Sequence, residues 1–305
     1  MTSHVENTEE FFIETKDGIS LFVRDFPLAD VSANANANAS AIATTTSTSH
    51  TPGVLIMHGL GEHSGRYLHI AQFFQALGFR VRSFDQRGHG QSTGGRGDVP
   101  DNETIVRDIE TVLNDFSAQL KQAPFLFAHS MGGLFATRFA LENKRPLAGL
   151  MLSSPAYSVK TSRFEKILFK ISSMIIPHLG VGHGTNGLYL SHDREVVLAY
   201  QNDKLVHSRI SASLFQSMLT AMRYVKAHAK KLPCPLLLLV AGSDLVVNPE
   251  GARAFSRQVA ESDQAAKLKT IIYPEFYHEI FNELEAWRAF DDVRAWLDEN
   301  NFLSK

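Results

Sequence analysis

The segment FLFAHSMGG, from Phe125 to Gly133, decides the fold. Its apolar start predicts a buried strand, and Ser130 stands where a helix would begin. A sharp strand-to-helix turn lifts a serine hydroxyl above a sheet, and it needs small residues two places before and after the serine, here Ala128 and Gly132. The segment therefore predicts a nucleophile elbow. On these residues alone, a glycine-rich helix start capped by a serine stays open.

Strands and helices alternate along most of the rest of the chain. Lys16-Asp17-Gly18 between two β-rich runs, 11–15 and 19–26, predicts a hairpin. Further strands are expected at 54–57, 79–84, 124–128, 147–152, 235–241 and 267–273, and helices at 69–77, 103–120, 132–142, 249–259 and 280–299. Such alternation predicts an α/β fold with a mostly parallel central sheet and helices on both faces.

The alternation also predicts how the chain is divided. Residues 1–156 and 227–305 form the two parts of an α/β core, and 157–226 form an inserted helical cap. An apolar stripe of the cap includes Ile167, Ile171 and Ile175, which either pack on the core or line the entrance for an apolar substrate. Residues 29–51 form a low-complexity insertion with too few large apolar side chains to offset the entropy of ordering.

Composition excludes several classes of protein. Lys and Arg number 30 against 32 Asp and Glu, and this balance argues against a nucleic-acid partner. The single cysteine, Cys234, excludes an internal disulfide framework. His58, His63 and His89 lack the partner ligands that a metal site needs, so we expect no metal and no cofactor. With no secretory signal and no long apolar run, we expect a cytoplasmic protein whose cap can contact a membrane surface.

A serine nucleophile needs a base, and the base needs an orienting carboxylate. Asp244 follows the strand expected at 235–241, and His278 follows the strand expected at 267–273. The carboxyl ends of parallel strands meet at one edge of a sheet, so both side chains should lie near Ser130. Each alone also fits a plainer role, Asp244 as a turn or cap residue and His278 as a surface histidine. Together they predict a catalytic triad.

The loop MHGLGEHSG at 57–65 follows the first buried strand of the core. Acyl transfer places negative charge on the former carbonyl oxygen, and each backbone N–H donor there contributes about 3 kcal/mol. We expect the N–H groups of Leu60 and Met131 to form this oxyanion hole. Gly59 and His129 are expected to contact the substrate. A phosphate-binding loop would need Gly-Lys-Ser/Thr, which this loop lacks.

Five short motifs occur in a fixed order along the chain. They are HGLGEHSGRY at 58–67, DQRGHG at 85–90, HSMGG at 129–133, GSD at 242–244 and HEIFNE at 278–283. Together they resemble the monoacylglycerol lipase/lysophospholipase group of α/β-hydrolases. The resemblance implies the α/β-hydrolase fold, a triad of Ser130, Asp244 and His278, the oxyanion hole named above, and a lid that touches lipid surfaces. Ala128 departs from the glycine common at its position.

These observations predict a serine carboxylic-ester hydrolase that releases a fatty acid from a mono-acyl lipid, either a monoacylglycerol or a lysophospholipid. Other leaving groups on the same fold stay open, namely those of a thioesterase, an amidase or aminopeptidase, or a general esterase. A catalytically silent binding protein on the same scaffold is the remaining alternative. The expected partner is a small-molecule lipid or ester, and the sequence leaves the oligomeric state open.

Overall fold

The computed structural model describes residues 8–28, 52–159, 175–184, 186–263 and 265–303. The strands of the main sheet are β1 (Glu9–Glu14), β2 (Ser20–Phe26), β3 (Gly53–Met57), β4 (Arg80–Phe84), β5 (Phe125–His129), β6 (Gly149–Ser153), β9 (Leu236–Ala241) and β10 (Leu268–Tyr273). A separate pair consists of β7 (Gly180–Gly182) and β8 (Arg209–Ser211). The helices are α1 (Leu68–Ala76), α2 (Thr104–Ala118), α3 (Ser130–Glu142), α5 (Arg194–Asn202), α6 (Ala212–His228), α7 (Pro249–Ala260) and α8 (Trp287–Glu299).

The main sheet has eight strands in the order β1-β2-β4-β3-β5-β6-β9-β10. The strands from β4 to β10 in this order pair in parallel, whereas β2 is antiparallel to both β1 and β4. β1 and β2 form the hairpin predicted around Asp17-Gly18, in which Gly18 has a φ of 78°. The mostly parallel α/β architecture predicted from the sequence is confirmed.

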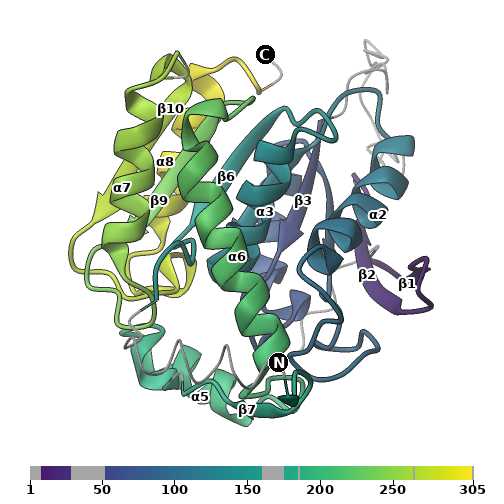
Figure 1. The fold of residues 1–305 in the computed structure, drawn as a ribbon. Helices are drawn as coiled ribbons and strands as arrows, with labels where there is room; N and C mark the ends of the chain where they lie inside the picture. Colours follow the sequence, from purple (N-terminus) through teal and green to yellow (C-terminus); the bar gives the residue numbers. More distant parts are fainter. Residues whose placement is uncertain (1–7, 29–51, 160–174, 185, 264, 304–305) are drawn as a thin grey trace, which may run out of the picture.

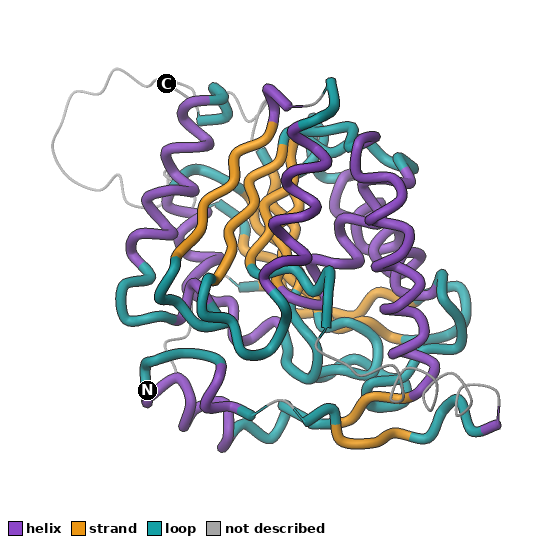
Figure 2. Tube along the Cα trace, turned by 60° about the vertical axis from the view of Figure 1, so that its left-hand side comes forward, coloured by secondary structure: helices purple, strands orange, loops and turns teal. Residues whose placement is uncertain are grey.

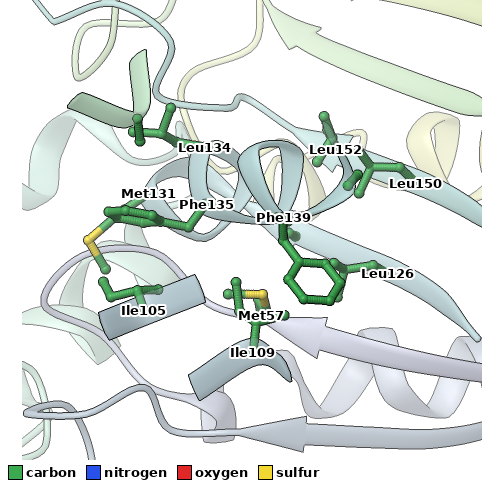
Figure 3. Close-up of a cluster of buried hydrophobic side chains, with 14 of the residues drawn as sticks. Met57, Ile105, Ile109, Leu126, Met131, Leu134, Phe135, Phe139, Leu150 and Leu152 are labelled. Carbon is green, nitrogen blue, oxygen red and sulfur yellow. The ribbon is translucent and has the colours of Figure 1, made fainter. Parts of the chain in front are cut away.

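Helices cover both faces of the sheet, as Figures 1 and 2 show. One apolar cluster joins the sheet to α2, α3, α6 and α7, and a second joins the other face to α1 and α8. Figure 3 shows part of the first cluster, formed by Met57, Ile105, Ile109, Leu126, Met131, Leu134, Phe135, Phe139, Leu150 and Leu152. β5 and β9 are buried along their whole length, because helices cover both of their faces. Cys234, just before β9, is also buried, with 3% of its surface exposed.

The last helix differs from its prediction. The sequence pattern predicts a helix over 280–299, but only a 3₁₀ turn forms at Ile280–Asn282, and α8 begins at Trp287. Glu283 follows the turn in an extended conformation, with ψ of 161°. Its carboxylate accepts the backbone N–H groups of Tyr277 and Leu284, and these contacts hold the chain away from a helical path. The prediction was wrong here because it rested on apolar spacing alone.

The segment predicted as a cap, 157–226, is described in part. β7, β8 and α5 lie beyond the end of the sheet that carries the site described below, at the bottom of Figure 1. α6 belongs to the same segment, but it packs against α3 and places Leu214, Met218 and Val225 in the first apolar cluster. Ile167, Ile171 and the 29–51 insertion lie outside the described residues. The division into core and cap stays a prediction.

Candidate active site

Ser130 lies at the turn between β5 and α3, above the carboxyl end of the sheet. Its φ is 53°, in the left-handed region that a side chain normally avoids. A Cβ on Gly132 would lie 2.4 Å from the carbonyl oxygen of His58, so this position has no room for a side chain. The predicted sharp turn is therefore present, with the small residue that it needs on the helix side.

His278 and Asp244 come from the loops that follow β10 and β9, and the structure brings both to Ser130. The Nε2 atom of His278 is 2.9 Å from the Ser130 Oγ, and its Nδ1 is 2.7 Å from the Asp244 Oδ2. All three residues are buried. The tautomer that fits both contacts carries its proton on Nδ1, which donates to Asp244, and leaves Nε2 to accept the hydroxyl proton of Ser130.

The electrostatics of this trio favour a charged carboxylate and a basic imidazole. Burial opposes ionisation of Asp244, but His278 and the N–H groups of Val246 and Val247 lower the pKa of the carboxyl below its usual value. Burial likewise opposes protonation of His278, but the charge and hydrogen bond of Asp244 raise the pKa of the imidazole above 6.5. The arrangement can take a proton from Ser130 and hold it as an imidazolium.

His129 lies beside the trio, with its ring centroid 4.6 Å from that of His278. Burial and the neighbouring imidazole lower the pKa of His129 to about 4. It is therefore neutral at pH 7, so no second positive charge opposes protonation of His278. His129 also lines the cavity above Ser130, where the sequence predicts that it contacts the substrate.

The backbone N–H groups of Leu60 and Met131 are the predicted oxyanion hole, and both residues line the same cavity as Ser130. In the part of the chain that the structure describes, neither N–H donates to another group of the protein. The preceding N–H, of Gly59, donates to the Glu62 Oε1 at 2.6 Å. That bond fixes the loop beside Ser130 and leaves the Leu60 amide available to a substrate oxygen.

The cavity above Ser130 has a volume of about 410 Å³. One part of its wall is apolar and is formed by Ala156, Val159, Leu190, Ile210, Phe215, Met218, Val246 and Val247. The rest includes Gly59, Glu62, His183, Tyr200 and Glu279. Of the apolar stripe predicted to line the entrance, only Ile175 is described; it is 73% exposed and is not among these residues.

An ionic cluster joins Glu62 and Glu279, which line the polar part of the wall, to Arg66, which lies outside the lining. Arg66 pairs with Glu62 and binds Glu279 through two hydrogen bonds, of 2.6 and 2.7 Å. Burial opposes all three charges, but Arg66 lowers the pKa of Glu62 to about 2 and lowers that of Glu279 as well. The two carboxylates in turn raise the pKa of Arg66. All three groups are therefore charged at neutral pH, with a net charge of one negative.

Sequence reasoning did not single out this cluster as part of the site. Glu62 and Arg66 are four residues apart in the 58–67 motif, but Glu279 is 213 residues from Arg66. The one available signal was the pair of oppositely charged side chains inside a motif rich in glycine and histidine. Among the described residues, no group of three or more His, Cys, Asp or Glu is placed to hold a metal ion. No described helix is long and apolar enough to span a bilayer.

Comparisons with known proteins show which family the chain resembles. A family model described as serine aminopeptidase, S33, matches residues 48–285. A monoacylglycerol lipase of Mycolicibacterium smegmatis is 31% identical over 80% of this chain and 87% of its own length. An uncharacterized abhydrolase domain-containing protein of Dictyostelium discoideum is 32% identical over 81% of this chain, which spans only 26% of that protein.

A solved structure gives the same result. The crystal structure of a monoacylglycerol lipase from Paleococcus ferrophilus matches 81% of this chain and 95% of its own, with a TM-score of 0.72 and 33% sequence identity. The comparisons thus confirm the α/β-hydrolase fold and the resemblance found in the motifs.

Proposed function

Since the chain belongs to the α/β-hydrolase family described as serine aminopeptidase, S33, we propose that Ser130, His278 and Asp244 are the catalytic triad of an esterase that cleaves monoacylglycerols. The observation that carries the proposal is the continuous hydrogen-bonded path from the Ser130 hydroxyl through His278 to Asp244. The cavity above Ser130 has both an apolar wall, which suits an acyl chain, and a polar wall, which suits an alcohol.

In the first half of the reaction, the Ser130 Oγ attacks the ester carbonyl while the His278 Nε2 takes its proton. Negative charge develops on the carbonyl oxygen, and the N–H groups of Leu60 and Met131 stabilise it. The imidazolium of His278, held by Asp244, then donates its proton to the glycerol oxygen as the ester bond breaks. Ser130 is left as an acyl ester, and glycerol departs.

In the second half, His278 takes a proton from water, which attacks the acyl carbonyl of Ser130. The same two N–H groups stabilise the second oxyanion. The bond to the Ser130 Oγ breaks, His278 returns the proton to that oxygen, and a free fatty acid leaves. The enzyme is then ready for the next ester, and the cycle needs no metal or cofactor.

The charge of the polar wall favours a neutral alcohol over a phosphate-bearing one. Glu62, Arg66 and Glu279 together carry one net negative charge, whereas the glycerol of a monoacylglycerol carries no charge. The phosphate of a lysophospholipid would bring a further negative charge to the same wall, and like charges repel. We therefore favour monoacylglycerol over lysophospholipid as the substrate.

The same wall argues against the aminopeptidase alternative, because an aminopeptidase needs an unpaired carboxylate to bind the free α-amino group of its substrate. Both oxygens of Glu279 already accept hydrogen bonds from Arg66, and the Glu62 Oε1 accepts from Gly59 and Tyr67. Neither carboxylate is thus a ready partner for an amine. This occupancy favours an ester with an uncharged alcohol.

The test compares wild type with Ser130→Ala on three lipids, 1-oleoylglycerol, lysophosphatidic acid and lysophosphatidylcholine, and on a peptidase substrate, an aminoacyl-naphthylamide. Wild type should cleave 1-oleoylglycerol with a kcat/KM about tenfold or more above that of the phosphate-bearing lipids, a difference of about 1.4 kcal/mol. Ser130→Ala should lose hydrolysis and labelling by a fluorophosphonate. Hydrolysis that survives in Ser130→Ala, or a preference for the naphthylamide, would contradict the proposal.

We also propose that the cap contacts a lipid surface from which the substrate enters. Several apolar side chains of the cap are exposed to solvent, among them Ile175, Ile176, Leu179, Val181 and Leu188. Leu179→Asp, with a side chain 57% exposed in wild type, should weaken binding to phosphatidylcholine vesicles and leave hydrolysis of p-nitrophenyl butyrate unchanged. Equal vesicle binding by the variant and wild type in a flotation assay would rule the contact out.

A further inference from the structure

We propose that Glu283 is a positioning residue for His278, and that it connects the loop carrying this histidine to the 190–193 segment of the cap. The proposal rests on the role proposed above for His278 as the general base. Glu283 is not among the residues that line the cavity, and only 2% of its side chain is exposed. It therefore acts on the reaction through other residues, without touching the substrate.

The carboxylate of Glu283 accepts hydrogen bonds from two directions. Its Oε1 accepts the backbone N–H of Tyr277 at 2.7 Å and the Nδ1–H of His192 at 2.8 Å. Its Oε2 accepts the backbone N–H groups of His192 and Leu284, at 3.2 and 3.3 Å. One buried carboxylate thus holds the residue just before His278 together with a residue of the cap. A carboxylate suits this place because it offers several acceptor sites and no donor.

The residue after His278 is held by the cap as well. The backbone N–H of Glu279 donates to the carbonyl oxygen of Leu190 at 2.8 Å. The backbone on both sides of His278 is therefore fixed, through Glu283 on one side and Leu190 on the other. A shift of the 190–193 segment would loosen both attachments together and change the distance from the His278 Nε2 to Ser130.

Two further contacts make the same connection. The rings of His192 and Tyr277 are stacked, with centroids 3.7 Å apart and planes inclined by 26°. The Ser191 hydroxyl donates to the carbonyl oxygen of Asn282 at 2.7 Å. Asp193, which follows His192, accepts the N–H of Glu195 and so begins α5. This helix carries Tyr200 to the cavity wall. The placement of α5 and the placement of His278 are thus linked by a short path of contacts.

The test compares Glu283→Ala, Glu283→Gln and His192→Ala with Glu285→Ala as the matched control. Glu285 lies in the same loop, but its side chain is 58% exposed and contacts Arg288. Each variant is assayed with p-nitrophenyl butyrate and with 1-oleoylglycerol, across pH, together with its rate of labelling by a fluorophosphonate and its thermal midpoint.

In Glu283→Ala, kcat should fall by about ten- to a hundredfold for both esters, because misplacement of the base affects every substrate. KM should change little, and labelling should slow by a similar factor. The acid limb of the pH profile should move to lower pH, because a loosened His278 interacts less with Asp244. Glu283→Gln, which keeps an acceptor for Tyr277, should restore most of the activity. His192→Ala should lower kcat by about threefold or more, and Glu285→Ala should match wild type.

The outcomes separate the possibilities. A folded Glu283→Ala protein with the kcat and pH profile of wild type would overturn the proposal, even if its thermal midpoint were lower. A change in KM for 1-oleoylglycerol alone would also overturn it, because that result would mark a substrate contact. Full kcat in His192→Ala would disprove the connection to the cap, and this variant decides that point if Glu283→Ala does not fold. A wild-type enzyme that neither hydrolyses esters nor reacts with the fluorophosphonate would instead refute the proposed function.

Discussion

Ser130 is in a backbone conformation that its own side chain disfavours. With φ of 53°, its Cβ makes close contacts with the backbone that cost of order 1 kcal/mol, and a glycine would avoid them. The surrounding contacts hold the residue there, including the Gly132 position that no larger residue fits. The side chain proposed as the nucleophile is thus placed above the sheet at the expense of stability.

This strain predicts a difference in stability between two inactive variants of Ser130. Ser130→Gly should be more stable than Ser130→Ala by about 1 kcal/mol in urea unfolding, because only the glycine avoids the Cβ contacts. Both variants should be inactive, because both lack the hydroxyl. Equal free energies of unfolding for the two variants would mean that the turn carries no strain.

The raised pKa of His278 predicts the pH dependence of activity. His278 must be neutral to accept the Ser130 proton, so kcat/KM should rise with pH through a value above the usual 6.5. Asp244→Asn removes the charge that raises this pKa, so the acid limb should move to lower pH while kcat falls by about 10³–10⁴-fold. The pH profile of fluorophosphonate labelling measures both effects. An acid limb that stays in place in Asp244→Asn would show that Asp244 does not set the pKa.

At the level of elements, the loop before α1 and the loop after β10 are joined by Arg66. This arginine is the only positive partner that the described residues give to Glu62 and Glu279; both carboxylates are buried, and 11% of the Arg66 side chain is exposed. Arg66→Met would leave two buried carboxylates without compensation, so it should lower the free energy of unfolding at pH 7 by about 3–5 kcal/mol. Arg107→Met, at a half-exposed pair with Asp101, is the control and should cost much less.

The stability that Arg66→Met loses should depend on pH, and the charges in the cluster fix the direction. In wild type the pKa of Glu62 lies at about 2, below its usual 4.5, so its contribution to stability is present above pH 4.5 and is lost as pH falls toward 2. In Arg66→Met the buried carboxylates should have raised pKa values, and acid should relieve their mutual repulsion. The difference in stability between the two proteins should therefore narrow from pH 7 to pH 4 in guanidinium unfolding. A difference that widens would contradict the assignment of charge to this cluster.

The elements that the sequence predicts well are those whose causes are local. The hairpin at Asp17-Gly18, the buried strand β9 and the elbow at Ser130 each follow from a few neighbouring residues. The start of α8 does not, because Glu283 is held by His192, which lies 91 residues away. The same holds for Arg66 and Glu279: their spacing in the sequence gives no sign that they meet.

Across the whole molecule, the candidate site joins segments that lie far apart in the chain. Ser130 and His278 are separated by 148 residues, and their meeting could be predicted because the carboxyl ends of parallel strands share one edge. The wall of the cavity above them was harder to predict, since Leu190 and Tyr200 come from the segment 157–226, which is predicted as a cap. No periodic pattern in the sequence specifies how this segment packs on the sheet and its helices.

Because Cys234 is buried, its reaction with a thiol reagent can report local unfolding of the protein. Burial raises the pKa of this thiol to about 12, and it is the one thiol in the sequence. A maleimide should therefore not react with the native protein. It should modify Cys234 only in molecules in which the start of β9 has separated from its neighbours. The rate of modification then measures how often this local unfolding occurs under native conditions. A substrate analogue bound in the cavity should lower that rate.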